Sequence, residues 1–197
     1  MKAMAKFVSK LRGVNNVVRW NFHPTIRKEN VAEHSFWVAL FVSIIACQRD
    51  RNELVLAAIM HDAEEAVTGD LPALVKGRVP KGAWEQVVDQ ANAELLDPAE
   101  HNIVGEESFK ALSAARDLSH ETVIKAADLL AALMFADEEL KMGNTYFATI
   151  RRELILSLEH VALKLEPETA RRLIRLVEDL GFDFADGLSR IPTMSHL

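Results

Sequence analysis

The fold is decided by the stretch from Asn30 to Gln48, which reads NVAEHSFWVALFVSIIACQ. Asn30 is a favourable N-cap residue, and Glu33 stands where a capping box places an acidic side chain. The stretch is apolar on nearly every side, which is typical of a helix that other helices surround. We therefore expect a central core helix over residues 30–48.

Around this segment the chain reads as further helices. Gly13 is predicted to end a short N-terminal helix, and residues 15–29 are predicted to form an ordered loop. The other helices are expected over 51–67, 83–96, 106–118, 119–141 with Ser119 as its cap, 145–165, and 168–180 with Gly181 closing it. Because no segment shows sustained period-two alternation, the predicted fold class is all-α. The length favours a single domain over residues 1–197.

Composition excludes several classes of function. The formal net charge of −6 argues against a protein that binds nucleic-acid polymers, which would present a basic face. The one cysteine, Cys47, excludes a disulfide within the chain. The N-terminus lacks the apolar region of a signal peptide, and no stretch approaches the ~20 apolar residues of a membrane span. We expect a cytoplasmic protein that acts on small molecules and has no membrane partner.

Four residues have the chemistry of a metal site: His34, the adjacent pair His61-Asp62, and Asp128. Neighbouring helical residues point about 100° apart, so a His-Asp pair can share an ion only if the ion lies beside the helix. Two imidazoles and two carboxylates suit Co²⁺, Mn²⁺, Zn²⁺ or Fe²⁺ better than Ca²⁺. A single histidine in a helix is more often a packed residue, and His-Asp pairs are common by chance. From the residues alone, both interpretations stay open.

Longer strings favour the metal site. They are Val18-Arg-Trp20, Glu29-Asn-Val-Ala-Glu-His-Ser35, His61-Asp-Ala-Glu-Glu65, Thr68-Gly-Asp-Leu-Pro72 followed by Lys76, and Lys125-Ala-Ala-Asp128. Across residues 18–128 the sequence therefore resembles the HD-domain superfamily of metal-dependent phosphohydrolases, and within it the bacterial 5′-deoxynucleotidases of the YfbR type. The resemblance implies an HD-domain helical bundle. Beyond Asp128, including the helices expected over 145–181, it extends only to length and helicity.

Carried over residue by residue, the resemblance implies roles for several side chains. One divalent ion, with Mg²⁺ the least favoured, would be held by His34, His61, Asp62 and Asp128. Glu65 would orient or deprotonate the attacking water, and Arg19 would orient the phosphate. Asp70 would lie near the sugar or the leaving oxygen. The residues expected to contact the substrate are Arg19, Trp20, His34, Asp70, Leu71, Pro72, Ala73 and Lys76.

The implied reaction converts a deoxynucleoside monophosphate into a deoxynucleoside and phosphate. Ala73 departs from the family pattern, in which a hydroxyl residue commonly follows the Asp-Leu-Pro turn, and this leaves the substrate's identity open. Compact viral HD enzymes that release triphosphate from dATP share the same framework. An enzyme of that kind would need extra cations for the outer phosphates, and Lys76, Arg78 and Lys81 are the candidates.

Two further alternatives concern the metal site. A two-metal HD enzyme would need additional ligands, for which His101 and His120 are available. A non-catalytic module stabilised by metal would need the ligands but neither Glu65 nor Arg19.

We also expect a homodimer, from the resemblance and from an apolar stripe over 145–165. The stripe consists of Phe147, Ile150, Leu154, Leu158 and Val161. The same stripe could instead be needed by the fold itself.

Overall fold

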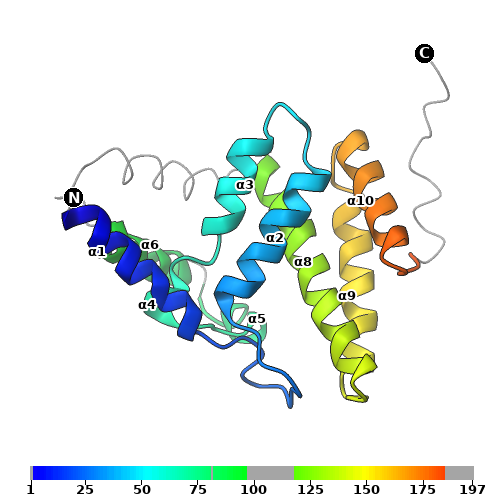
Figure 1. Ribbon diagram of the computed structural model, residues 1–197, viewed down its shortest axis with the longest axis horizontal. Coiled ribbons are helices and arrows are strands. Elements are labelled where there is room, and N and C mark those ends of the chain that lie inside the picture. Colours follow the sequence, from blue (N-terminus) through cyan, green and yellow to red (C-terminus); the bar gives the residue numbers. More distant parts are fainter. Residues whose placement is uncertain (1, 81, 97–117, 185–197) are drawn as a thin grey trace.

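The computed structural model describes residues 2–80, 82–96 and 118–184. Its elements are α1 (Lys2–Leu11), the 3₁₀ helix η1 (Arg12–Asn16), α2 (Val31–Ile45), α3 (Arg51–Met60), α4 (Glu65–Thr68), α5 (Ala73–Lys76), α6 (Ala83–Leu96), α8 (Leu118–Lys141), α9 (Phe147–Ala162) and α10 (Pro167–Asp179) (Figure 1). The described residues contain no strand beyond one isolated bridge between Val18 and Asn30. The all-α prediction is confirmed. The helix expected over 106–118 falls almost entirely outside the described residues.

The core lies among α2, α3, α8, α9 and α10, which run side by side in Figure 1. α2 packs against α3 and α8, and α8 also packs against α9. Ala126 and Ala127 on α8 are completely buried, and such small side chains allow two helix backbones to approach closely. The short helix α4 packs against η1 and α6, and α1 also packs against α6.

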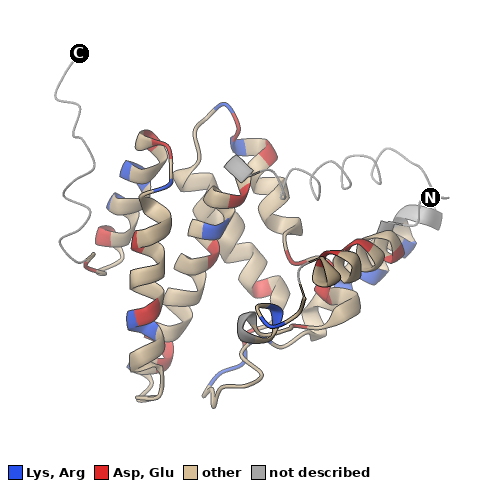
Figure 2. Ribbon diagram, turned by 180° about the vertical axis from the view of Figure 1, so that it is seen from behind, with Lys and Arg blue, Asp and Glu red and all other residues tan. Residues whose placement is uncertain are grey.

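Charged residues of both signs occur along the whole described chain. In Figure 2, Lys and Arg positions are interspersed with Asp and Glu positions along the described ribbon. This distribution agrees with the formal net charge of −6. Among the described residues, no helix is both long enough and apolar enough to cross a membrane.

The central helix α2 begins as predicted and ends earlier than predicted. The Asn30 side chain caps it by accepting the backbone N–H of Glu33 at 2.9 Å. The Glu33 carboxylate accepts from Arg27 at 2.7 Å. At the other end, the carbonyl of Ala46 accepts from Arg172 at 2.8 Å, which satisfies a terminal acceptor and helps to stop the helix before Gln48.

The single helix predicted over 51–67 is wrong, because the chain leaves the α-helical path after Met60. Residues 61–64 form successive turns, in which Ala63 donates its N–H to Met60 O and Glu65 donates to Asp62 O, each at 3.1 Å. Such three-residue steps wind the backbone more tightly than an α-helix does. A short helix, α4, then runs to Thr68.

Two smaller predictions are corrected, and a third is confirmed. Gly13 lies inside η1, where a β-carbon would come within 3.3 Å of Ala66, so close packing and not a helix stop explains this glycine. Ser119 lies within α8 and does not precede it. Gly181 does follow α10 with a left-handed φ of 81°, as a C-terminal glycine should.

The apolar stripe of α9 is used by the fold. Phe147 and Leu158 are fully buried, while Ile150, Leu154 and Val161 pack against the core clusters. This stripe therefore cannot serve as a free dimerisation surface. Exposed apolar side chains occur on α2 instead, at Phe36, Leu40 and Ile44.

Candidate metal centre

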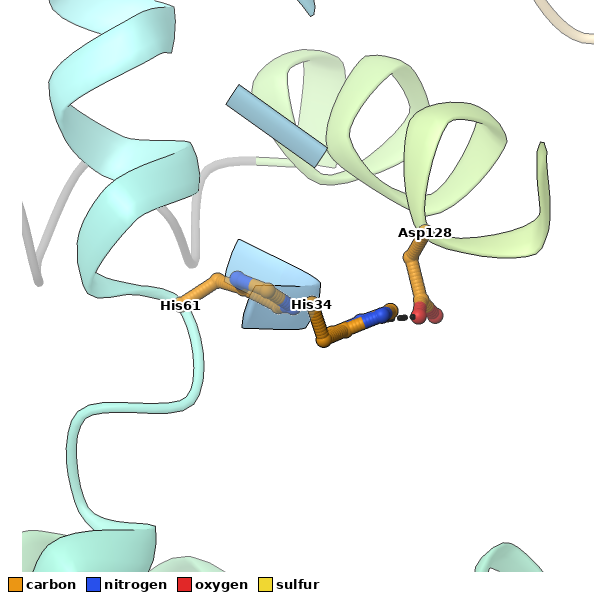
Figure 3. Close-up of side chains that lie close together, drawn as sticks. All are labelled: His34, His61 and Asp128. Atoms are coloured by element: carbon orange, nitrogen blue, oxygen red, sulfur yellow. Dashed lines mark ion pairs between the residues drawn. The ribbon is translucent and has the colours of Figure 1, made fainter. Parts of the chain in front are cut away.

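Three helical elements bring His34, His61 and Asp128 together. His34 comes from α2, His61 follows α3, and Asp128 lies within α8 (Figure 3). One ligand atom from each lies within 4.8 Å of the others, and this is the one such group of three among the described residues. His34 is completely buried, with its Nε2 3.0 Å from Asp128 Oδ1. The side chains fit one metal ion held between three helices.

His61 is oriented by the backbone behind it. Its Nδ1 lies 2.7 Å from the carbonyl oxygen of Ala58. Because a carbonyl only accepts, Nδ1 carries the hydrogen, and Nε2 faces the centre. This arrangement is the one that commonly holds metal-binding histidines in proteins.

Asp62 lies beside this group of three. Its Oδ2 is 3.2 Å from His61 Nε2 and 3.1 Å from Arg19 Nη1. On a continuous helix His61 and Asp62 would point about 100° apart. The turns after Met60 instead bring both side chains to the same place.

The electrostatics of the centre suit a bound cation. Burial, followed by the charge of Arg19, lowers the pKa of His34 to about 4, so this imidazole is neutral and able to bind a metal. Burial also disfavours a charged His61, but Asp62 and Asp128 outweigh it and raise the His61 pKa to about 9. The Nε2 atoms of both histidines are buried and face carboxylate oxygens at 3.0 and 3.2 Å, in a geometry that makes no regular hydrogen bond. A divalent ion would satisfy these atoms and the adjacent carboxylates.

Arg19 reaches the centre from the loop that precedes α2. The bridge between Val18 and Asn30 folds this loop back, and it includes the bond from Arg19 N–H to Glu29 O at 2.9 Å. The Arg19 guanidinium then lies between acidic side chains, with Nη1 3.1 Å from Asp62 and Nη2 3.9 Å from Asp128. A largely buried arginine is thus held directly beside the three metal-binding candidates.

Glu65 and Lys76 form a second pair at the edge of the centre. Glu65 is almost completely buried, and its Oε1 accepts from Lys76 Nζ at 3.1 Å. Its other oxygen, Oε2, is buried without a hydrogen-bond partner. Burial, followed by the nearby charge of Asp62, raises the pKa of Glu65 to about 8. Lys76 in turn lies 5.3 Å from the ring centroid of Trp84 on α6.

The other residues predicted to contact the substrate differ in how deeply they are buried and in what they touch. Asp70 is half-buried, and this burial raises the pKa of its carboxyl group, while the nearby backbone N–H of Trp20 lowers it. Trp20 stacks on Phe135 with ring centroids 5.2 Å apart and joins the aromatic cluster there. Leu71 and Pro72 are partly buried in the turn before α5. The side chain of Ala73 lies outside the described part of the chain.

Two side chains at the centre were missed by the sequence reasoning. Glu29 is 2% exposed and contacts both Arg19 and Trp20. Lys125 Nζ donates to Asp128 Oδ2, the carboxylate oxygen that does not face His34, at 2.6 Å. Both residues stand inside the motif strings, but their partners become apparent only when the loop and the helix are folded. His120 does not belong to the group, and His101 and Lys81 lie outside the described residues.

Comparisons with known proteins agree with this architecture. The family model of YfbR-like 5′-deoxynucleotidases matches residues 6–169. The chain is 30% identical over 166 residues to a 5′-deoxynucleotidase of Shewanella oneidensis, covering 79% of this chain and 85% of that protein. It is also 30% identical over 177 residues to a 5′-deoxynucleotidase of Yersinia pestis, covering 84% and 87%.

A solved structure shows the same fold. It is that of the cyanophage S-2L HD phosphohydrolase DatZ, bound to dA and one catalytic Zn²⁺ ion. The TM-score is 0.64 at 19% identity, and the match covers 88% of this chain and 94% of that chain.

Proposed function

This chain belongs to the YfbR-like family of 5′-deoxynucleotidases, and we propose that it releases phosphate from deoxynucleoside 5′-monophosphates with one divalent metal ion. The observation that carries the proposal is the position of Arg19. Its guanidinium lies against Asp62 and beside Asp128, where it can reach an anion bound at the metal group. A purely structural metal site has no use for such an arginine.

We propose His34, His61, Asp62 and Asp128 as the ligands. Once bound, a divalent ion would polarise a phosphoryl oxygen and lower the pKa of coordinated water toward ~7. Two imidazoles in the donor set favour Co²⁺, Mn²⁺, Zn²⁺ or Fe²⁺ over Mg²⁺, which prefers oxygen donors.

Arg19 is proposed to bind the phosphate of the substrate. Two N–H groups of a planar guanidinium match two phosphoryl oxygens, and the bonds strengthen as negative charge develops on them. The acidic residues around Arg19 hold the guanidinium in place before the substrate arrives. Little rearrangement is then needed on binding.

Glu65 is proposed as the general base. Its unpartnered Oε2 can accept a proton from the attacking water, while Lys76 holds Oε1 and fixes the carboxylate's orientation. The water oxygen bonds to phosphorus as the bond to the 5′ oxygen breaks. Asp70, whose pKa burial raises, is proposed to deliver a proton to that leaving oxygen.

The contacts of Lys76 favour a monophosphate over a triphosphate as the substrate. A triphosphohydrolase needs cations that are available to the outer phosphates, whereas Lys76 is engaged by Glu65 and lies over the Trp84 ring. Arg78 is exposed. Release of triphosphate from dATP remains the second candidate, and the assay below separates the two.

The test is a panel of deoxynucleoside mono- and triphosphates assayed with Mn²⁺, Co²⁺, Zn²⁺ and Mg²⁺. We expect inorganic phosphate from the monophosphates, loss of activity with chelator, and recovery with Co²⁺ or Mn²⁺. Release of triphosphate would instead support the second candidate. Metal binding without turnover of any nucleotide would favour a non-catalytic module, and two equivalents of tightly bound metal would favour a two-metal enzyme.

We propose in addition that the chain forms one domain over residues 1–197 and pairs as a homodimer. Support for pairing comes from the family resemblance and from the exposed apolar residues Phe36, Leu40 and Ile44 of α2.

A further inference from the structure

The loop that carries Arg19 and Trp20 is closed by Glu29. The backbone of Glu29 accepts the N–H of Arg19 at 2.9 Å, and Val31 donates to Val17 O at 3.0 Å. Residues on either side of the loop are therefore paired, although about ten positions separate them in the sequence. This pairing places the Glu29 side chain next to those of Arg19 and Trp20.

One oxygen of Glu29 serves both neighbours. Oε2 accepts the indole N–H of Trp20 at 3.0 Å and lies 3.4 Å from Arg19 Nε. The carboxylate is 2% exposed, so water does not screen either contact. The Nε contact with Glu29 is an ion pair and not a hydrogen bond, and on the other side of the guanidinium Nη1 lies 3.1 Å from Asp62 and Nη2 3.9 Å from Asp128.

Trp20 also needs to be held. It is the one non-glycine residue with a positive φ, at 62°, among the described residues. For a bulky side chain this conformation is strained and persists only where its surroundings enforce it. The bond to Glu29 and the stack on Phe135 provide that enforcement.

We infer that Glu29 is the positioning residue for the substrate-binding pair Arg19-Trp20, fixing the guanidinium so that its Nη atoms face the metal group. The inference rests on the proposed function of Arg19 as the phosphate-binding residue. Glu29 acts through that residue and does not touch the reacting atoms.

A merely structural role fits less well. Burial raises the pKa of Glu29 to about 6 despite the adjacent Arg19, so the ionised carboxylate lowers the stability of the metal-free protein above that pH. A buried charge that opposes folding is more typical of a functional site than of a structural anchor. Replacing Glu29 by glutamine is therefore expected to leave the protein folded.

The test is a double-mutant cycle of Glu29→Gln and Arg19→Ala, assayed with dNMP and Mn²⁺. We expect Glu29→Gln alone to lower kcat roughly tenfold, as a displaced catalytic group does. In the Arg19→Ala background the same change should alter kcat by less than about twofold, because its effect passes through Arg19. Metal content should stay at the wild-type level. Val177→Ala, a core truncation on α10, controls for lost stability.

The inference would be overturned if Glu29→Gln lowered kcat by the same factor in wild type and in Arg19→Ala. It would also be overturned if Val177→Ala, at the same melting temperature as Glu29→Gln, lowered kcat equally. If wild type hydrolyses no deoxynucleotide, the proposed function fails, and an NMR measurement then decides the role of Glu29. The indole N–H signal of Trp20, assigned with Trp20→Phe, should shift in Glu29→Ala. An unchanged signal would show that Glu29 does not hold the pair, whereas a shifted signal would support the positioning role.

Discussion

Replacing Arg19 by lysine tests whether the planar guanidinium, and not merely its charge, serves the reaction. In the structure three nitrogens of Arg19 face three carboxylates: Nε to Glu29 at 3.4 Å, Nη1 to Asp62 at 3.1 Å, and Nη2 to Asp128 at 3.9 Å. A lysine has one nitrogen, so it can replace one of these contacts and cannot present a fork to a phosphate.

The expected loss follows from the bonds that disappear. A hydrogen bond to a charged group contributes about 1.5–3 kcal/mol, and Arg19→Lys removes at least one that forms in the transition state. We therefore expect kcat/KM for dNMP to fall by ~10²-fold, equivalent to about 2.7 kcal/mol. Metal content and melting temperature should stay near wild type.

Steady-state kinetics with Mn²⁺ across several dNMPs would measure this loss. The matched control is Arg49→Lys, at a side chain that is 89% exposed and paired only with its neighbour Asp50 among the described contacts. This control should retain wild-type kinetics. If Arg19→Lys also stayed within a few-fold of wild type, Arg19 would lie outside the reaction and the phosphate-binding role would be rejected.

Three further outcomes are expected. Glu65→Ala should keep its metal, by elemental analysis, and lose turnover by ~10²-fold or more, since it removes the base; wild-type activity would assign Glu65 to structure alone. In the metal-free protein the folded pKa of Glu29, raised to about 6 by burial, lies above its unfolded value. As pH rises from 4.5 past 6, the free energy of unfolding of wild type should therefore fall by about 2 kcal/mol relative to that of Glu29→Gln. If urea denaturation gave the same difference between the two proteins at every pH, this expectation would be wrong. Light scattering at micromolar concentration should give twice the chain mass, and a monomeric mass would refute the homodimer.

The helical fold was predictable because its signals are local. Asn30 caps α2 as the sequence indicates, and one side of that apolar helix lies in the core, whereas Phe36, Leu40 and Ile44 are exposed. The break after Met60 was not predictable in the same way. The residues from His61 to Ala66 include no glycine or proline that would end a helix, yet α3 ends at Met60 and α4 begins at Glu65.

The candidate site was predictable as a set of residues but not as a network. His34, His61 and Asp128 could be singled out by type and motif. The pairing of Glu29 with Arg19 and Trp20 depends on the loop folding back through a single bridge. No periodicity or composition signals a contact of this kind, so the role of Glu29 becomes apparent only in three dimensions.

Because of the break after Met60, one carbonyl oxygen has two potential donors: a backbone N–H that would extend the helix and the imidazole of a proposed metal ligand. In an uninterrupted α-helix the carbonyl oxygen of Ala58 would accept the backbone N–H of Asp62. Here it accepts from the His61 imidazole at 2.7 Å. Any change that strengthened helix formation over 61–64 would therefore bring a second donor, the Asp62 N–H, to this oxygen and weaken its bond to the imidazole. In this segment, a more stable helix would therefore leave His61 less firmly oriented and lower the affinity of the proposed site for its metal ion.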